Sequence, residues 1–234
     1  MSALVVAIGG TGTDVGKTFV ACALVRALAR VGLACGVKPF ESGHEESLGA
    51  DQLALATVSS VSASDLGLRL RTFPSPVAPP EAARRAGESL SGDAFLHAFQ
   101  DVRARFDGVL VLELAGGLFS PFDERRTNAD VVRCLGPEAH VLVAPNRLGV
   151  LHDVRATVIA CQSQGVAIDA LVLTHPKPLA ADDSCQSNPA ALASWMQSTP
   201  IVLSHCDSVD ATELLLDAWT RGAMRRRSPQ HQLR

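Results

Sequence analysis

The stretch GTGTDVGKT, residues 10–18, constrains the fold of this chain more than any other. It follows an apolar run at 4–8, LVVAI, and opens a segment at 17–32, KTFVACALVRALARVG, whose apolar residues recur on one helical face. A strand, a glycine-rich loop and a helix in this order are typical of a phosphate-binding loop, because the first helical amides and the positive end of the helix dipole attract anions. In this interpretation Lys17 reaches the outer phosphates and Thr18 binds magnesium.

The loop departs from the strict phosphate-loop pattern by one position. That pattern places a glycine five residues before the glycine of Gly-Lys-Thr, where this chain has Thr11 between Gly10 and Gly12. The alternative is a strand-to-helix turn that contains Gly-Lys-Thr by chance. We favour phosphate binding, because strand, loop and helix are all in register with Lys17 and Thr18.

Strands and helices are expected to alternate along the rest of the chain. Apolar runs typical of strands buried on both faces lie at 34–38, 108–114, 140–144, 169–173 and 200–203. Segments with helical periodicity lie at 92–106, 152–165 and 210–227. This alternation predicts an α/β fold of the phosphate-loop NTPase type, with a three-layer open, mostly parallel sheet and helices on both faces.

The domain organisation is expected to be simple. We predict a single domain over residues 1–224 and a polar, basic C-terminal tail over 225–234. The stretch at 71–92 is rich in Pro, Ala and Ser, and we expect it to form a long loop within the domain.

Composition excludes several classes of protein. A net charge of -3 argues against a general nucleic-acid binder, whose surface would be basic. No apolar run approaches the ~20 residues needed to span a bilayer, and no positive charge precedes the apolar start as in a signal peptide. The six cysteines form no C-x-x-C pair, which predicts reduced thiols. We therefore expect a cytoplasmic protein that binds neither nucleic acid nor membrane.

Three further stretches place polar residues at the ends of predicted strands, where open parallel sheets bind ligands. VKPFESGHEE carries Lys38 and VLVLELAGG carries Glu113, a carboxylate that is costly against an apolar wall unless a cation shares the site. APNRLGVLHDV places His152 in the first turn of a helix, where amides can hold a carboxylate or simply connect strand to helix. Lys38 is alternatively a surface lysine, and Asp51 a first-turn acid favoured by the dipole.

The motifs GTGTDVGKT, KPFESG, ADQLAL, VLELAGG and NRLGVLHDV, in this order, resemble the ATP-dependent dethiobiotin synthetases over about residues 4 to 205. That family's loop has five residues between its outer glycines, which matches Gly10 to Gly16. The resemblance implies a homodimer that binds ATP and Mg²⁺ over the loop and a diamino acid along the subunit interface. It also implies closure of a cyclic urea from 7,8-diaminononanoate, CO₂ and ATP through a carbamate and a carbamic-phosphoric mixed anhydride.

The resemblance assigns roles by position. The implied catalytic residues are Lys17, Lys38 and Thr13, and the implied magnesium ligands are Thr18, Asp51 and Glu113. The nucleotide and its cation are expected to contact Asp14, Val15, Gly16, Lys17, Thr18, Phe19, Asp51, Glu113, Ala115, Gly116, Thr174 and His175. The diamino acid is expected to contact Ser42, Gly149, Val150 and His152.

Four departures from the family pattern bear on these roles. Leu114 stands where the family often has glycine, and Pro80 where it often has histidine. His152 replaces a typical asparagine, and Thr174 with His175 lies where many members read adenine with asparagine. Ordinary sequence divergence is the milder explanation of these differences. The alternative is that the substrate of this chain is shifted from that of the family.

Three other functions compete with dethiobiotin synthesis. A related ligase such as a cobyrinate diamide synthase normally carries an amidotransferase domain, for which this chain has no room beyond residue 205. A phosphate-loop ATPase switch of the partitioning or positioning type usually has a second lysine early in the loop, and residues 10–15 contain none. The third is a degenerate relative that binds nucleotide but has lost its diamino-acid site.

Overall fold

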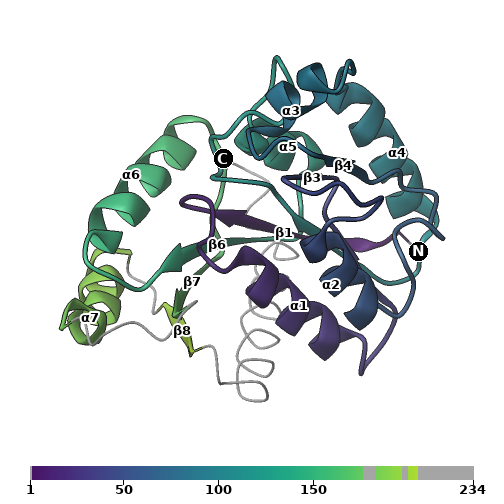
Figure 1. The fold of residues 1–234 in the computed structure, drawn as a ribbon. Helices are drawn as coiled ribbons and strands as arrows, with labels where there is room; N and C mark the ends of the chain where they lie inside the picture. Colours follow the sequence, from purple (N-terminus) through teal and green to yellow (C-terminus); the bar gives the residue numbers. More distant parts are fainter. Residues whose placement is uncertain (1, 176–182, 197–199, 205–234) are drawn as a thin grey trace.

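A computed structural model describes residues 2–175, 183–196 and 200–204. Its centre is a six-stranded sheet in the order β2-β5-β1-β6-β7-β8, and every neighbouring pair is parallel (Figure 1). The expected strands are all present, so the predicted α/β fold is confirmed. The strands are β1 (Leu4–Gly10), β2 (Ala34–Val37), β5 (Val109–Glu113), β6 (Ala139–Pro145), β7 (Ala170–His175) and β8 (Ile201–Ser204).

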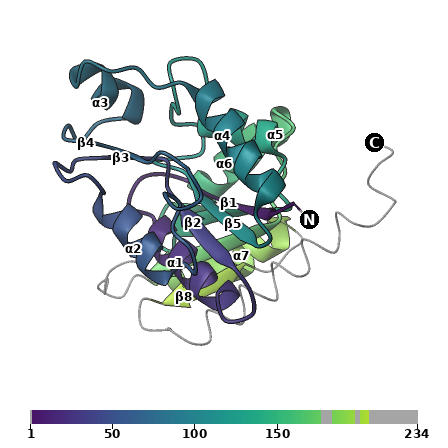
Figure 2. The same ribbon diagram turned by 90° about the vertical axis from the view of Figure 1, so that its right-hand side faces the viewer.

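Helices cover both faces of this sheet, because alternate side chains of the buried strands point to opposite sides. Val6 and Ile8 of β1 join one core with α1 and α2, whereas Val5 and Ala7 join another with α4 and α5. Figure 2 shows these two helical layers on either side of the strands. The helices are α1 (Lys17–Leu28), α2 (Ala50–Val58), α4 (Gly92–Arg105), α5 (Asn128–Leu135), α6 (Val150–Ser163) and α7 (Ser184–Met196).

The stretch at 71–92 is not the long loop that its composition predicted. It begins with β4 (Arg71–Phe73), which pairs in parallel with β3 (Phe40–Ser42), and it contains α3 (Pro79–Arg85). Proline suits the first position of a helix, since its missing N–H would have no intrahelical partner there. Phe73 is buried against the alanines of α3, so this segment forms a small core of its own.

Some predictions concern residues outside the described part of the chain. The boundary at residue 224, the last helix at 210–227 and the basic tail all fall there. None of the five cysteines within the described residues forms a disulfide. No helix in this described part of the chain has the length and hydropathy required to cross a bilayer.

Candidate active site

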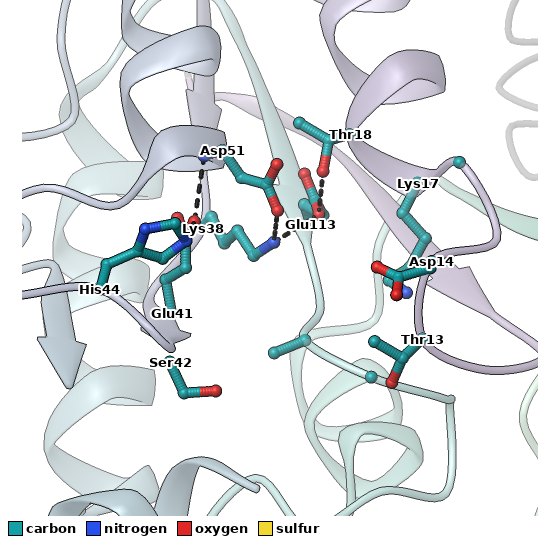
Figure 3. Close-up of a pocket in the computed structure, with 13 residues that line it drawn as sticks. Thr13, Asp14, Lys17, Thr18, Lys38, Glu41, Ser42, His44, Asp51 and Glu113 are labelled. Atoms are coloured by element: carbon teal, nitrogen blue, oxygen red, sulfur yellow. Dashed lines mark hydrogen bonds and ion pairs between the residues drawn. The ribbon is translucent and has the colours of Figure 1, made fainter. Parts of the chain in front are cut away.

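A cavity of about 530 Å³ opens at the carboxyl ends of β1, β2 and β5, the edge at which open parallel sheets bind ligands. Figure 3 shows the phosphate loop on one side of it, with Ser42 and His44 on the other. All of its lining residues are predicted site residues except Glu41 and His44. The lining residues are Thr13, Asp14, Gly16, Lys17, Thr18, Lys38, Glu41, Ser42, His44, Asp51, Glu113, Ala115 and Gly116.

The phosphate loop curls around the start of α1 and leaves its first amides without a side-chain cap. Gly16 has a φ of 90°, a left-handed conformation that favours glycine, and a Cβ there would lie 2.9 Å from Thr174 Oγ1. Asp14 is also left-handed, with a φ of 56°. Lys17 folds back so that its Nζ donates to the carbonyl of Gly12 at 2.7 Å. These features are those of an anion-binding loop at a helix N-terminus.

Lys17 is a buried amine whose protonated form is disfavoured by its surroundings in the loop. Burial lowers its pKa from 10.5 to about 8, an effect that Glu113 opposes and Lys38 reinforces. An anionic ligand would supply the missing negative charge and stabilise the ammonium. The electrostatics of Lys17 therefore fit a site for phosphate.

A buried ion-pair cluster lies beside the loop, and strand register puts it there. Val37 is opposite Leu112 in the pairing of β2 with β5, so the next residues, Lys38 and Glu113, meet at the sheet edge. Lys38 Nζ donates to Glu113 Oε1 at 2.9 Å and also to Asp51 Oδ2 (Figure 3). The lysine and the two acids therefore lie in one cluster.

The charges of this cluster depend on one another. Burial raises the pKa of Glu113, whose side chain is fully enclosed, and Lys38 opposes the effect. Burial also acts to lower the pKa of Lys38, but the Glu113 and Asp51 carboxylates outweigh it and raise that pKa above its ordinary value. Lys38 is therefore a cation at neutral pH, held by two carboxylates of which one cannot reach water.

The oxygen atoms of this cluster suit a magnesium ion. Thr18 Oγ1 donates to Glu113 Oε1 at 2.8 Å, and Glu113 Oε2 is buried with no hydrogen-bond partner in the described residues. A hydroxyl and two carboxylates are hard donors of the kind that Mg²⁺ selects, with remaining positions left to phosphate and water. Among the described residues no group of three or more His, Cys, Asp or Glu is placed to hold a metal. A site here would therefore need ligands from outside the side chains, as nucleotide phosphates provide.

Sequence reasoning missed Glu41 and His44 as members of the site. Glu41 is only 5% exposed, and its carboxylate accepts from the amides of Asp51 and Gln52. His44 Nε2 lies 3.2 Å from Glu41 Oε1. Both residues fall in the KPFESG stretch and the residues after it, but only the structure reveals which backbone the carboxylate reaches.

Most of the predicted nucleotide residues that do not line the cavity pack against the phosphate loop or belong to the core beneath it. Thr174 Oγ1, fully enclosed, donates to the carbonyl of Val15 at 2.6 Å. The Val15 side chain is buried, and Phe19 packs against the same core. His175 instead lies beside Asn146, with Nε2 3.2 Å from the amide nitrogen Nδ2. Thr174 therefore braces the phosphate loop from β7.

We predict that Thr174→Val lowers the free energy of unfolding by about 1–2 kcal/mol, because it leaves the buried Val15 carbonyl without its donor. Thr57→Val is the matched control, since the Thr57 hydroxyl bonds Leu53 O on an exposed helix surface. Its effect should stay within about 0.5 kcal/mol. Urea denaturation of both variants measures the difference, and equal losses would contradict a bracing role for Thr174.

The predicted diamino-acid residues at the start of α6 do not line this cavity. The Val150 side chain is buried in the core, His152 is exposed, and the amides of Val150 and His152 donate to Arg147 O and Gly149 O within the same turn. A second cavity of about 290 Å³ nevertheless connects α6 with the phosphate loop. Its lining residues are Thr11, Gly12, Thr13, Gly117, Leu118, Phe119, Ser120 and Thr157.

Two of the departures from the family pattern lie away from the cavity. Leu114 is 1% exposed and packs in the core that includes α4 and α5, so its side chain does not line the cavity. Pro80 lies in the first turn of α3 and lines neither cavity. The replacement of glycine by Leu114 therefore changes core packing rather than access to the phosphate loop.

Comparison with solved structures supports the fold. A Borrelia burgdorferi B31 structure described as a plasmid partition protein bound to AMPPNP superposes with a TM-score of 0.54. It covers 94% of this chain and 99% of its own, but only 10% of the residues are identical. At that identity the likeness concerns the phosphate-loop fold alone.

Comparison of sequences identifies the family. A family model described as an AAA domain matches residues 4–203. The ATP-dependent dethiobiotin synthetase of Anaeromyxobacter sp. (strain K) is 36% identical over 197 residues, covering 84% of this chain and 87% of its own. The synthetase of Caulobacter sp. (strain K31) is 34% identical over 201 residues, covering 84% and 86%. This chain therefore belongs to the ATP-dependent dethiobiotin synthetase family.

Proposed function

We propose that this chain is a cytoplasmic ATP-dependent dethiobiotin synthetase. It forms carbon–nitrogen bonds, closing a cyclic urea from 7,8-diaminononanoate (7,8-diaminopelargonate), CO₂ and ATP to give dethiobiotin, ADP and phosphate. The observation that carries the proposal is the meeting of Lys17, Lys38, Thr18, Asp51 and Glu113 in one cavity at the sheet edge. Relatives that bear this name and align over most of the chain support it.

The nucleotide phosphates fit the loop between Gly10 and Gly16. The uncapped amides at the start of α1 would hold the phosphate oxygens, and Lys17 would contact the outer phosphates. Thr18, Asp51 and Glu113 would hold Mg²⁺, which supplies positive charge to the phosphates when bound. This role gives the enclosed Glu113 carboxylate a second cation besides Lys38.

The chemistry needs positive charge more than it needs a base or a nucleophile from the protein. One substrate amine attacks CO₂, and loss of a proton leaves a carbamate. A carbamate oxygen then attacks the γ-phosphorus of ATP, which forms the mixed anhydride and releases ADP. The second amine attacks the carbamate carbon, phosphate leaves, and loss of a proton completes the cyclic urea. Lys17 and Lys38 would neutralise the charge that develops, while Thr13 and Ser42 would hydrogen-bond the carbamate end.

The distal carboxylate of the diamino acid requires a site away from the phosphates. We propose a homodimer in which Gly149, Val150 and His152 of one subunit serve the cavity of the other. Two exposed apolar side chains support an interface here, Leu148 just before α6 at 74% exposure and Ile159 within it at 58%. The cavity between Thr13 and Thr157 provides space toward that helix. Light scattering on the purified protein should give twice the mass of one chain.

A product assay tests the proposed reaction. The purified protein is given ATP, Mg²⁺, bicarbonate and 7,8-diaminononanoate, and dethiobiotin is measured by mass spectrometry, with phosphate release as a parallel readout. We expect dethiobiotin only when all components are present. Phosphate release without dethiobiotin would indicate a ligase with a shifted substrate. ATP binding with no reaction would favour a nucleotide switch of the partitioning type.

A further inference from the structure

Helix α2 begins at the edge of the cavity with an N-cap residue that has no side chain to accept from the first helical amides. Of the amides at the helix start, its own Gln52 accepts only from that of the N-cap residue, through Oε1 at 3.1 Å. Its N-cap residue is Gly49, and the carboxylate of Glu41 on β3 takes the place of a cap. Glu41 Oε1 accepts from the Asp51 amide at 3.0 Å, and Oε2 accepts from the Gln52 amide at 2.9 Å. Both oxygens of one buried carboxylate are thus used on two consecutive amides at the helix start.

The packing around this carboxylate leaves little freedom. A Cβ on Gly49 would lie 2.2 Å from Glu41 Cδ, so the carboxylate occupies the space that any other N-cap side chain would need. Gln52 is equally fixed, because its Nε2 donates to Lys38 O and to Arg71 O, both at 3.1 Å. The first turn of α2 is therefore held from β3 on one side and from the end of β2 on the other.

The position of this turn decides where the Asp51 carboxylate lies. Asp51 pairs with Lys38, whose Nζ also donates to Glu113 Oε1 at 2.9 Å. The Asp51 side chain is 39% exposed and is therefore not enclosed by packing of its own, in contrast to Glu113 at 0%. Its backbone, fixed by Glu41, is what brings the carboxylate to the cluster (Figure 3).

We infer that Glu41 is a positioning residue that sets Asp51 against Lys38 and Glu113 and thereby sets the affinity of the site for a divalent cation. A serine or aspartate at position 49 would cap α2 locally, but it would leave the helix start free to move relative to β3. The remote carboxylate instead ties Asp51 to the strand that carries Ser42 into the cavity. This inference rests on the proposed magnesium site of the synthetase.

The test measures binding of Mn²⁺, a paramagnetic substitute for Mg²⁺, by electron paramagnetic resonance in the presence of AMPPNP. Glu41→Ala removes both acceptors from the first turn of α2. We expect the Mn²⁺ dissociation constant to rise about 10-fold or more, the range typical when a residue that orients a metal ligand is lost. An unchanged dissociation constant in the folded variant would overturn the inference.

Asp123→Ala is the matched control. Asp123 is also 5% exposed, its Oδ2 accepts from the Gly92 amide at the start of α4 at 2.8 Å, and a Cβ on Gly92 would lie 2.4 Å from that oxygen. It lines neither cavity described above. We expect Asp123→Ala to lower the thermal midpoint as Glu41→Ala does but to leave Mn²⁺ affinity at the wild-type value. Equal losses of affinity in both variants would indicate a general loss of stability and would overturn the inference.

A milder variant covers the case in which Glu41→Ala does not fold. Glu41→Gln keeps one acceptor oxygen but turns a donor toward the second amide, so we expect a smaller rise in the Mn²⁺ dissociation constant at nearly normal size and packing. Wild-type affinity in Glu41→Gln would count against the positioning role. The wild-type protein also distinguishes failure of the proposed reaction from failure of this inference. Failure to form dethiobiotin contradicts the proposed reaction, whereas Mn²⁺ binding is measured independently of product.

Discussion

Lys38→Met is expected to reduce the rate of dethiobiotin formation at least ~100-fold, because the variant loses a positive charge where negative charge develops. Lys38 is a cation at neutral pH, since Glu113 and Asp51 raise its pKa against the effect of burial. Turnover at saturating ATP and diamino acid measures the loss. Near-normal turnover would contradict the proposed role of Lys38.

The same substitution should also destabilise the protein. Its ammonium is the partner of Glu113, whose side chain is 0% exposed, and removing one member of a buried pair typically costs about 3–5 kcal/mol. Asp51, at 39% exposure, can turn to water and should contribute little to this loss. Urea denaturation in the presence of EDTA measures the change in the free energy of unfolding without a metal ion.

The pH dependence identifies the source of that loss. Burial raises the pKa of Glu113 above its ordinary value of 4.5, so in Lys38→Met the folded state binds this proton more tightly than the unfolded state. The stability deficit should be small below pH 4.5 and grow as pH rises. Lys38→Met with Glu113→Gln removes both charges and should recover most of the stability but none of the activity. A deficit that persists in the double variant would mean that packing, not the unpaired carboxylate, causes the loss.

The sheet and the composition of the site were predictable because both follow from simple patterns. Strands buried on both faces are continuous apolar runs, and each such run became a strand of the parallel sheet. Polar residues that end such runs lie at one edge, which is why Lys38 and Glu113 could be expected to meet before their register was known. This part of the prediction therefore rested on the sheet edge that the residues share and not on individual contacts between them.

The missed elements are short or begin with unusual residues. Helix α5 spans only Asn128–Leu135, although Thr127 and Asp130 form a capping box that marks its start. Helix α3 opens with two prolines. Because 71–92 is rich in Pro, Ala and Ser, the whole stretch resembled a loop in sequence. Proline disrupts the interior of a helix but is favoured in its first turn, and only the tertiary packing decided which effect applied here.

Glu41 was missed for a different reason. Its partners are backbone amides of Asp51 and Gln52, and backbone groups leave no mark on a sequence. The one available signal was Gly49, whose lack of a side chain makes room for the carboxylate. Thr174 is similar, because its partner is the carbonyl of Val15, far away in the chain. Roles that depend on contacts with a distant backbone therefore need the structure.

Lys17→Met is expected to reduce turnover at least ~100-fold, as Lys38→Met does, but to have the opposite effect on stability. The pKa of Lys17 falls from 10.5 to about 8 in the folded protein. One pKa unit corresponds to about 1.4 kcal/mol, so folding with a protonated Lys17 costs roughly 3 kcal/mol at neutral pH. The variant removes this cost and also the hydrogen bond to Gly12, so we expect it to be about 1–2 kcal/mol more stable than the wild type in the absence of nucleotide.

The pH dependence of this gain follows from the same shift. Below pH 8 Lys17 is protonated in both folded and unfolded states, and the full cost of its burial is present. As pH rises from about 8 to 10.5 the folded state releases the proton first, so the advantage of Lys17→Met should shrink across this range. Arg26→Met, which removes an exposed charge from the same helix, should be neutral at each pH and keep full activity. A stability loss in Lys17→Met at pH 7, measured without nucleotide, would show that the lysine stabilises the loop. A gain would show that Lys17 is retained at the expense of stability, because its buried ammonium becomes favourable only when phosphate occupies the loop.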